Sequence, residues 1–409
     1  MLRIRAKSAL TMSGPPLADA AVLIDDDGTI AAVGRQRDVD SPPGAAAIDF
    51  GECVLLPGLI NAHCHLDFSM LRGGLLNSGR FADWIVRINA LKRNLSLEDF
   101  RRAIDAGIAE ALEHGTTSLV NIESFPELLI ELPRTPLRVW WCLELMDIRK
   151  RIASERFSLG CLRALEPQCA AGATRFGLSP HSPYTASGEL FRLAARVAAT
   201  HGMLFTTHVS ESADEIEMFT RAGGGLHDLV ATVGGPPLPQ RRDTPLGSLA
   251  SAGLIPEHAL LVHMNGLAEA DFDWLAAHAA RRRLSVAHCP QSHAFFAHPP
   301  FDYHRLRAAG VNICLGTDSL ASSPSLSLFD EMRAFAMAFP GVPPAETLEL
   351  ATTNAAAALG HEGRLGTLAP GAAADLVLVP QHSADPAESA LAHRGPVAAS
   401  LLGGRLLTA

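Results

Sequence analysis

Residues able to bind a metal or move a proton stand repeatedly where short apolar runs of the sequence end. His63 and His65 follow the first of these runs, His208 ends the fifth and Asp318 ends the last. If the runs are strands of a parallel barrel, their carboxyl ends share one face, where active sites are built. Several histidines on one rim are difficult to explain by packing, because each buried imidazole needs a hydrogen-bond partner. The pattern therefore predicts a site of metal and proton chemistry.

The first local signal is His63-Cys64-His65, because alternate residues of a strand point to the same side. Two neutral imidazoles form half of a divalent-metal site, although an isolated pair at this spacing is a weak indication. His208 adds a third nitrogen and Asp318 adds a carboxylate, with one position left for water. This donor set favours Zn²⁺ and tolerates Fe²⁺. Taken alone, Asp318 has a second interpretation as the N-cap of a following helix.

Further residues are candidates for proton transfer and substrate contact beside the metal. Glu211 stands three residues after His208, in HVSES, where it would lie near the metal without binding it. A carboxylate there can take a proton from water and return it to a leaving nitrogen; the alternative is an exposed glutamate at the start of an acidic helix. His263 ends the sixth run and can orient water or hydrogen-bond a tetrahedral centre. His181 follows the fourth run and joins the same rim.

These residues need elements that bring the ends of the runs together. Helices are predicted at 98–114, 187–201, 268–281 and 326–339, between apolar runs. Apolar runs separated by helices favour a parallel sheet buried on both faces. Eight of them predict an α/β fold with a (β/α)8 TIM-like barrel; an open doubly wound sheet is the alternative, but no G-x-G-x-x-G follows the first run. The runs span 54–61, 116–121, 137–145, 174–179, 203–208, 259–263, 284–288 and 312–318.

Both ends of the chain alternate short apolar runs with turn signals. AAVLIDDDGTIAAVG predicts a strand, an Asp-Gly turn and a second strand, and GAAADLVLVP and PVAASLLGGRLLTA repeat this texture near the C-terminus. We expect the two ends to pair in one small sheet. The predicted domains are therefore a β-domain shared by residues 1–53 and 361–409, and a barrel at residues 54–360.

Composition limits the partners. The 409 residues carry a formal net charge of −9, which argues against nucleic acid and anionic membranes because phosphate would be repelled. No apolar run is long enough to span a membrane, and the basic N-terminus lacks the apolar segment of a secretory signal. Seven scattered cysteines without a C-x-x-C pair are typical of reduced thiols. We expect a cytoplasmic protein that acts on a small molecule, and a homo-oligomer is left open.

Seven motifs occur in a specific order: PGLINAHCHLD, SPHSPYTAS, HVSESADE, LLVHMNGL, HCPQS, LGTDSLAS and GTLAPGAAADLVLV. Together they resemble the amidohydrolase superfamily, in the branch of S-adenosylhomocysteine/methylthioadenosine deaminases and triazine hydrolases, over about residues 20–400. The resemblance implies a metal-bearing barrel and a small β-sandwich made from both chain ends. The residues that it implies as metal ligands are His63, His65, His208 and Asp318. Those that it implies for the reaction are Glu211, His263 and Asp318, with His181 in contact with substrate.

Lysine usage bears on the number of metal ions. The chain has three lysines, Lys7, Lys92 and Lys150. In barrels of this kind a second metal is often bridged by a carbamylated lysine on a middle strand, and no lysine follows position 150. We therefore expect one divalent ion, Zn²⁺ in preference to Fe²⁺.

Two departures from this branch concern the substrate. Trp84, in FADWI, matches the branch and is expected to bind substrate, but the acid that the resembled adenosine deaminases use for ribose has no counterpart before Glu98. HCPQSH replaces the usual HCPxSN, and AFFAHPPFDYH follows it. His293 and Phe295 are therefore candidates for a wall that stacks on an aromatic ring; an ordinary surface loop is the alternative.

The predicted activity is hydrolytic deamination of an aminated heteroaromatic ring with release of ammonia. Candidate substrates are S-adenosylhomocysteine, methylthioadenosine and aminodeoxyfutalosine. Hydrolysis of another ring, an amide or a carbon–chlorine bond, in triazines, pterins, guanine or cyclic ureides, is the alternative, and a metal-stabilised binding protein without catalysis is a third. Glu211 and His263 argue against the third, because binding needs no proton-handling groups. The role of His288 is left open, and Arg149 and Arg151 either reach a polar tail of the substrate or form a solvated charge run.

Overall fold

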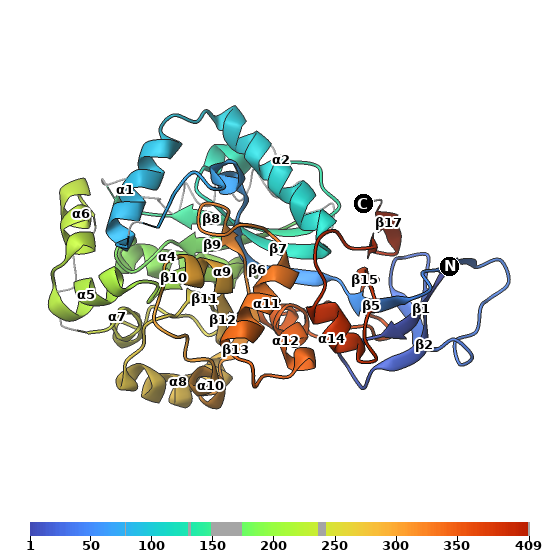
Figure 1. Cartoon of the computed structure of the whole chain (residues 1–409). Coiled ribbons are helices and arrows are strands. Elements are labelled where there is room, and N and C mark those ends of the chain that lie inside the picture. Colours follow the sequence, from blue (N-terminus) through green and yellow to red (C-terminus); the bar gives the residue numbers. More distant parts are fainter. Residues whose placement is uncertain (78, 130–131, 149–173, 236–242, 408–409) are drawn as a thin grey trace.

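The computed structural model describes residues 1–77, 79–129, 132–148, 174–235 and 243–407. Figure 1 shows two parts side by side. One is a large sheet with helices around it, and the other is a smaller sheet near which both ends of the chain lie. The chain therefore starts in the smaller sheet, forms the larger one, and returns to the smaller sheet at its end.

The larger sheet has nine strands within the described residues, and every pair of neighbours is parallel. Their order in the sheet is β13-β12-β11-β10-β9-β8-β7-β6-β14, so successive strands are neighbours. The strands are β6 (Leu59–His65), β7 (Thr116–Glu123), β8 (Arg138–Leu145), β9 (Thr174–Pro180), β10 (Leu204–Val209), β11 (Leu260–His263), β12 (Ser285–His288), β13 (Asn312–Leu315) and β14 (Asp318–Ser319).

The sheet curls back on itself at Gly316 and Thr317. These two residues separate β13 from β14 in the chain, yet β13 and β14 stand at opposite ends of the sheet order. The amide of Thr317 donates to the carbonyl of His63 at 3.0 Å. A Cβ on Gly316 would lie 2.7 Å from that carbonyl oxygen, so this approach to β6 requires a glycine. The last predicted run is thus two short strands that join the edges of the sheet.

Helices alternate with the strands as predicted. The four predicted helices are α2 (Leu97–Glu113), α4 (Gly188–His201), α8 (Glu269–Arg282) and α11 (Leu328–Ala338). Ser96 caps α2 in a reciprocal capping box with Asp99, and Ser187 caps α4. The other helices are α1 (Phe81–Lys92), α5 (Ala213–Arg221), α6 (Gly225–Val233), α7 (Pro245–Ser251), α9 (Pro290–Phe295), α10 (Tyr303–Ala308), α12 (Pro344–Leu350), α13 (Thr353–Ala358) and α14 (Pro386–Leu391), with 3-10 turns η1 (Leu66–Leu71) and η2 (Pro126–Leu129).

Both faces of the larger sheet are buried, which explains why its strands are continuous apolar runs. Along β11, Leu260 and Val262 belong to one apolar cluster and the intervening Leu261 to another. Along β12, Val286 and Ala287 divide between the same two clusters. Alternate side chains therefore pack on opposite faces of the sheet.

The smaller sheet pairs the two ends of the chain, as the sequence predicts. Its main order is β17-β16-β15-β5-β1-β2-β3, and β4 also pairs with β1. Gly28 forms the predicted turn between β2 and β3 at φ 81°, and a Cβ there would lie 2.4 Å from the carbonyl oxygen of Gly403. The strands are β1 (Leu2–Ala9), β2 (Leu17–Ile24), β3 (Ile30–Arg35), β4 (Ala46–Asp49), β5 (Cys53–Pro57), β15 (Leu376–Pro380), β16 (Ala399–Leu402) and β17 (Arg405–Leu407).

The first predicted barrel strand, residues 54–61, is in fact two strands in two sheets. β5 ends at Pro57 and belongs to the smaller sheet, whereas β6 starts at Leu59 in the larger one. Gly58 lies between them, and a Cβ at this position would meet Oγ1 of Thr117 at 2.1 Å. The chain therefore passes from one sheet to the other at Gly58.

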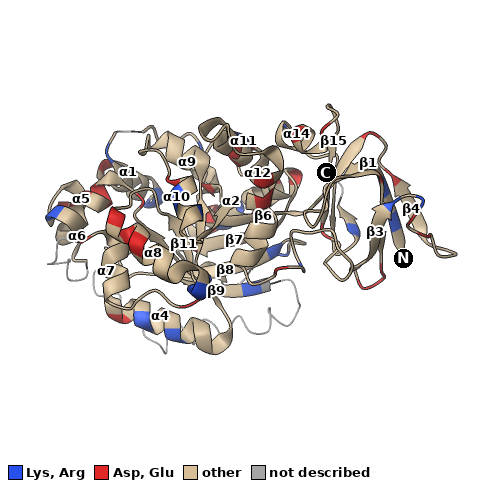
Figure 2. Cartoon of the chain, turned by 90° about the horizontal axis from the view of Figure 1, so that it is seen from below, with Lys and Arg blue, Asp and Glu red and all other residues tan. Residues whose placement is uncertain are grey.

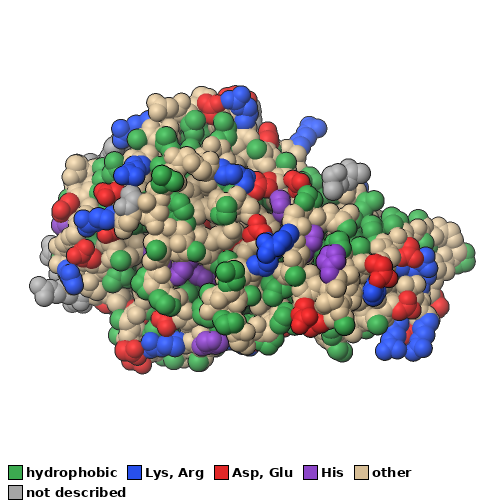
Figure 3. All heavy atoms as spheres, viewed as in Figure 1, with side chains coloured by type: hydrophobic (Ala, Val, Ile, Leu, Met, Phe, Trp, Pro, Cys, Tyr) green, Lys and Arg blue, Asp and Glu red, His purple; other side chains and the backbone are tan. Residues whose placement is uncertain are grey.

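Charged residues of both signs are distributed over the outer helices and the smaller sheet (Figure 2). On the face in Figure 3 they are interspersed with apolar side chains and several histidines. Among the described residues, no helix combines the length and apolar character needed to cross a bilayer.

Candidate active site

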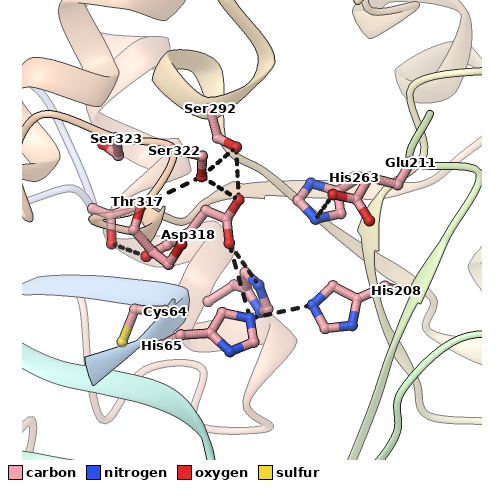
Figure 4. A network of polar contacts seen from close by, with 12 residues as sticks. Cys64, His65, His208, Glu211, His263, Ser292, Thr317, Asp318, Ser322 and Ser323 are labelled. Carbon is pink, nitrogen blue, oxygen red and sulfur yellow. Dashed lines mark hydrogen bonds and ion pairs between the residues drawn. The ribbon is translucent and has the colours of Figure 1, made fainter. Parts of the chain in front are cut away.

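Three barrel strands bring the predicted metal ligands together at their carboxyl ends (Figure 4). His63 and His65 come from β6, His208 from β10 and Asp318 from β14, and all four are buried. Nε2 of His65 lies 3.4 Å from Nε2 of His208. Oδ1 of Asp318 lies 3.7 Å from Nε2 of His63 and 3.9 Å from Nε2 of His65. Three imidazoles and one carboxylate therefore face a common centre.

Neighbouring groups orient two of these ligands. Nδ1 of His208 donates to the backbone carbonyl of His181 at 2.9 Å, which leaves Nε2 with a lone pair toward the centre. Oδ2 of Asp318 accepts hydrogen bonds from the hydroxyls of Ser292 at 2.6 Å and Ser322 at 3.0 Å, so Oδ1 is the oxygen directed at the histidines. A divalent metal requires ligands held in this way.

The donor chemistry fits a metal ion. Nδ1 and Nε2 of His63 are buried and have no hydrogen-bond partner in the described part of the chain. Burial, with the charge of His181 and His63, lowers the pKa of His208 to about 3, so its imidazole is neutral at pH 7. The ligand atoms of His63, His65 and Asp318 lie within 4.8 Å of one another, as do those of His63, His208 and His263. Imidazole nitrogens and a carboxylate oxygen at these separations form the kind of donor set that a divalent ion needs.

Glu211 and His263 form a pair beside this centre. Oε1 of Glu211 lies 3.5 Å from Nε2 of His263, and both side chains are buried. The Glu211 amide donates to Oε2 of Glu215 at 2.7 Å, and its carbonyl accepts from Nδ2 of Asn265 at 2.9 Å. Burial, reinforced by the charges of Asp318 and Glu215, raises the pKa of Glu211 well above its usual value. A carboxyl with a raised pKa next to a metal centre is suited to carrying a proton.

The backbone around the centre is strained at several non-glycine residues. Ser210, His263, Met264 and Asp318 have φ values of 54°, 73°, 53° and 55°, in the left-handed region. Such conformations cost free energy and persist where surrounding contacts enforce them. Here the Met264 amide donates to the carbonyl of Val209 at 3.1 Å, which joins the ends of β10 and β11. Two of these four residues, His263 and Asp318, are predicted site residues.

The predicted substrate residues have different surroundings. His181 follows β9, and its Nδ1 contacts the hydroxyls of Thr185 at 2.7 Å and Ser182 at 3.0 Å. Trp84, on α1, packs against Phe81 and Phe296 at ring separations of 5.9 and 5.0 Å. The structure therefore groups His181 with the polar centre through His208, and Trp84 with an aromatic cluster.

The segment after β12 packs inward through some of its rings. His288 stacks on Phe301 with ring centres 3.9 Å apart, and His293 contacts Oδ1 of Asn265 at 3.0 Å through Nδ1. Phe295 contacts Phe296 at 5.0 Å, and Phe296 in turn meets Trp84. The segment joins α1 to the loop that holds Glu211. Arg149 and Arg151 lie outside the described residues.

Three acids beside the centre are absent from the sequence prediction. Glu123 ends β7, Glu144 lies near the end of β8, and Asp67 follows His65 by two residues. Asp67 and Glu123 are buried, and both oxygens of Asp67 and Oε2 of Glu123 have no hydrogen-bond partner among the described residues. Glu123 carries the signal that identifies the histidines, a polar residue at the end of a barrel strand, whereas Glu144 is followed by Leu145 and does not. By contrast, Glu98 is exposed in the first turn of α2 and pairs with Arg101.

Comparisons with known proteins identify the family of the chain. The model of the amidohydrolase family matches residues 54–407. A 5-methylthioadenosine/S-adenosylhomocysteine deaminase of Halobacterium salinarum is 29% identical over 377 residues, which cover 89% of this chain and 80% of the relative. An aminodeoxyfutalosine deaminase of Deinococcus radiodurans is 30% identical over 349 residues, which cover 81% and 79% of the two chains.

Solved structures agree in fold. An adenosine deaminase of Xanthomonas campestris with bound zinc has a TM-score of 0.83 and 25% identity, over 99% of this chain and 92% of that one. An atrazine chlorohydrolase of Arthrobacter aurescens TC1 complexed with zinc has a TM-score of 0.82 and 22% identity, over 100% and 95% of the two chains. The curled parallel sheet is thus a TIM-like barrel, and the chain belongs to the amidohydrolase family of hydrolases.

Proposed function

We propose that the protein is a hydrolase with one divalent metal, preferably Zn²⁺, that deaminates the adenine ring of a nucleoside-type substrate. The observation that carries the proposal is the buried group of three imidazoles and Asp318 beside the pair of Glu211 and His263. The deaminase names of the relatives supply the reaction class.

The metal would be held by His63, His65, His208 and Asp318. A divalent ion in such a site acts as a Lewis acid and lowers the pKa of water toward about 7. The residues of the chain then position the reactants and transfer protons.

The remaining steps follow from the residues around the metal site. Glu211 takes a proton from the attacking water and delivers it to the amino group that leaves, while Asp318 accepts the second proton of the water, which passes to the ring nitrogen beside the reacting carbon. The water oxygen forms a bond to the ring carbon, the carbon–nitrogen bond breaks, and ammonia departs. His263, 3.5 Å from Glu211, stabilises the tetrahedral centre by hydrogen bonding.

A single ion agrees with the positions of the described lysines. Lys7 pairs with Glu52 near the smaller sheet. Lys92, on α1, places its ammonium 4.1 Å from the ring centre of Phe68 and 5.7 Å from that of Phe125. Neither lies on a middle barrel strand, where a bridging lysine is required.

We also propose the predicted two-layer arrangement for the β-domain made from both ends of the chain, whose N-terminal part extends beyond the predicted residue 53 to Pro57 because β5 belongs to the smaller sheet. Strand β1 supports it because β4 and β5 pair with opposite halves of this strand, while β2 pairs along its whole length. Strand β15 then pairs with β5 and carries the C-terminal strands into the same domain.

The function is tested by measuring bound metal and ammonia release from purified protein. The substrate panel contains methylthioadenosine, S-adenosylhomocysteine, 5′-deoxyadenosine and aminodeoxyfutalosine, with guanine, pterins and a chlorinated triazine as comparisons. We expect close to one divalent ion per chain and ammonia from at least one adenine nucleoside. Chloride release from the triazine without ammonia from any nucleoside would contradict deamination, and protein without stoichiometric metal would contradict the metal site.

A further inference from the structure

Glu144 and His181 form a polar pair at the ends of β8 and β9, next to His208. Glu144 lies on β8 and His181 follows β9, and these strands are paired in parallel. Oε1 of Glu144 lies 3.9 Å from Nε2 of His181, which is beyond hydrogen-bond distance. The two atoms face each other but do not form a hydrogen bond.

Each residue of the pair is oriented through its other atom. Oε2 of Glu144 accepts a hydrogen bond from the Ser124 hydroxyl at 2.7 Å. Nδ1 of His181 contacts the Thr185 hydroxyl at 2.7 Å. Oε1 of Glu144 and Nε2 of His181 are therefore held in place with hydrogen-bonding capacity to spare. Only 4% of the Glu144 side chain and 22% of the His181 side chain are exposed to solvent, so a bound molecule reaching them displaces little water.

The pair lies directly against the metal ligands. The ligand atoms of Glu144, His181 and His208 are all within 4.8 Å of one another. A second metal ion is disfavoured here, because Nε2 of His208 already faces Nε2 of His65 at 3.4 Å. A cation is supplied nearby by Lys92, whose charge acts on His181 and on the buried acids Asp67 and Glu123. The open capacity of Glu144 therefore suits a neutral hydrogen-bond donor.

We propose that Glu144 is a specificity residue that accepts hydrogen bonds from hydroxyl groups on the non-reacting part of the substrate, next to the ring contact made by His181. The inference rests on the proposed function and names the substrate class as a hydroxyl-bearing glycoside of an aminated ring. Proton transfer occupies the side of β10 and β11, so the remainder of the substrate extends over β8 and β9. Glu98, the first acid after Trp84, is too exposed for this role.

The test compares adenosine with 2′,3′-dideoxyadenosine in wild type, Glu144→Gln and the matched control Glu127→Gln, which changes an exposed glutamate of η2. Ammonia release gives kcat/KM for each pair, and where dideoxyadenosine is turned over too slowly its Ki as a competitive inhibitor replaces it. Hydrogen bonds to a carboxylate predict that wild type and Glu127→Gln favour the hydroxylated compound on the order of 100-fold. Glu144→Gln is expected to reduce this preference to within about 5-fold, with metal content unchanged.

Three results bear on the inference separately from the function. Equal use of both compounds by wild type would overturn it, and so would a Glu144→Gln preference equal to that of wild type. An equal loss on both compounds would also overturn it, because Glu144 would then act on the reaction and not on the hydroxyls. If the wild-type protein released no ammonia from any adenine nucleoside, the proposed function would be refuted instead. Ammonia release by wild type is therefore measured first.

Discussion

Nδ1 of His208 donates its hydrogen to the backbone carbonyl of His181, at 2.9 Å, and so the end of one barrel strand fixes the tautomer of a residue on the next. Nε2 of His208, the nitrogen left with a lone pair, lies 3.4 Å from Nε2 of His65. A cation at this centre accepts both lone pairs when His65 carries its hydrogen on Nδ1. The hydrogen bond to the His181 carbonyl therefore specifies the ligand atom of His208.

His208→Ala is expected to remove both metal and turnover. It deletes one of the three nitrogen ligands, and the remaining ligands are too few to hold the ion tightly. Metal analysis after dialysis should give well below half of the wild-type content, and ammonia release should fall to background. Thermal unfolding checks that the variant is folded. A variant that keeps one tightly bound ion per chain would remove His208 from the ligand set.

Glu211→Gln is expected to separate metal binding from catalysis. Glu211 faces His263 at 3.5 Å and belongs to neither group of atoms that could hold the ion with His63. The amide keeps the size of the side chain but cannot accept and return a proton, so kcat should fall by about 10²–10⁴-fold. Metal content should equal that of wild type. A fully active Glu211→Gln would disprove the proton-transfer role.

The sequence predicts the strand-end residues well because the rule is local and the topology is simple. A polar residue closing an apolar run, such as His263 or Asp318, needs only the parallel order to reach the common rim. Glu144 escapes this rule because Leu145 follows it, so the run 137–145 does not end in a polar residue. Glu123 escapes because the predicted run stops at 121, two residues before β7 ends.

Other features depend on contacts far apart in the sequence. The break of the first run at Gly58 follows from Thr117, which occupies the space of a side chain. No pattern within residues 54–61 records that neighbour. Asp318 likewise accepts hydrogen bonds from two serines in separate segments, Ser292 after β12 and Ser322 after β14. These contacts become visible only when the sheet has curled.

Gly316→Ala is expected to destabilise the fold where the sheet closes. A Cβ at this position would lie 2.7 Å from the carbonyl oxygen and 2.8 Å from the Cβ of His63, so β6 or the segment before Asp318 must move. We expect a loss of about 1–3 kcal/mol in the free energy of unfolding and weaker metal binding. Gly341→Ala is the matched control, since a Cβ there has no neighbour within 4 Å. Equal unfolding midpoints for the two variants would contradict this account of the closure.

Glu331 is not a predicted metal ligand, and its burial predicts a pH dependence of stability. Its side chain is fully buried on α11, and its oxygens accept from the backbone and side-chain nitrogens of Gln291, each at 2.9 Å. Burial raises the pKa of Glu331 from 4.5 to about 8, against the lowering effect of these hydrogen bonds. Between these two values the unfolded chain has lost a proton that the folded chain retains, so folding becomes less favourable as the pH rises.

The contribution of Glu331 to the free energy of unfolding should therefore decrease between about pH 5 and pH 8, by up to about 1.4 kcal/mol per pH unit. Glu331→Gln removes the titrating proton, so urea denaturation should show the free energy of unfolding of this variant rising relative to that of wild type over the same range. The variant should also be less stable than wild type at low pH, because the NH2 group of its amide faces a nitrogen of Gln291 that needs an acceptor. Exposed Glu127→Gln should keep the wild-type slope. Parallel curves for wild type and Glu331→Gln would show that Glu331 is ionised in the folded protein throughout this range.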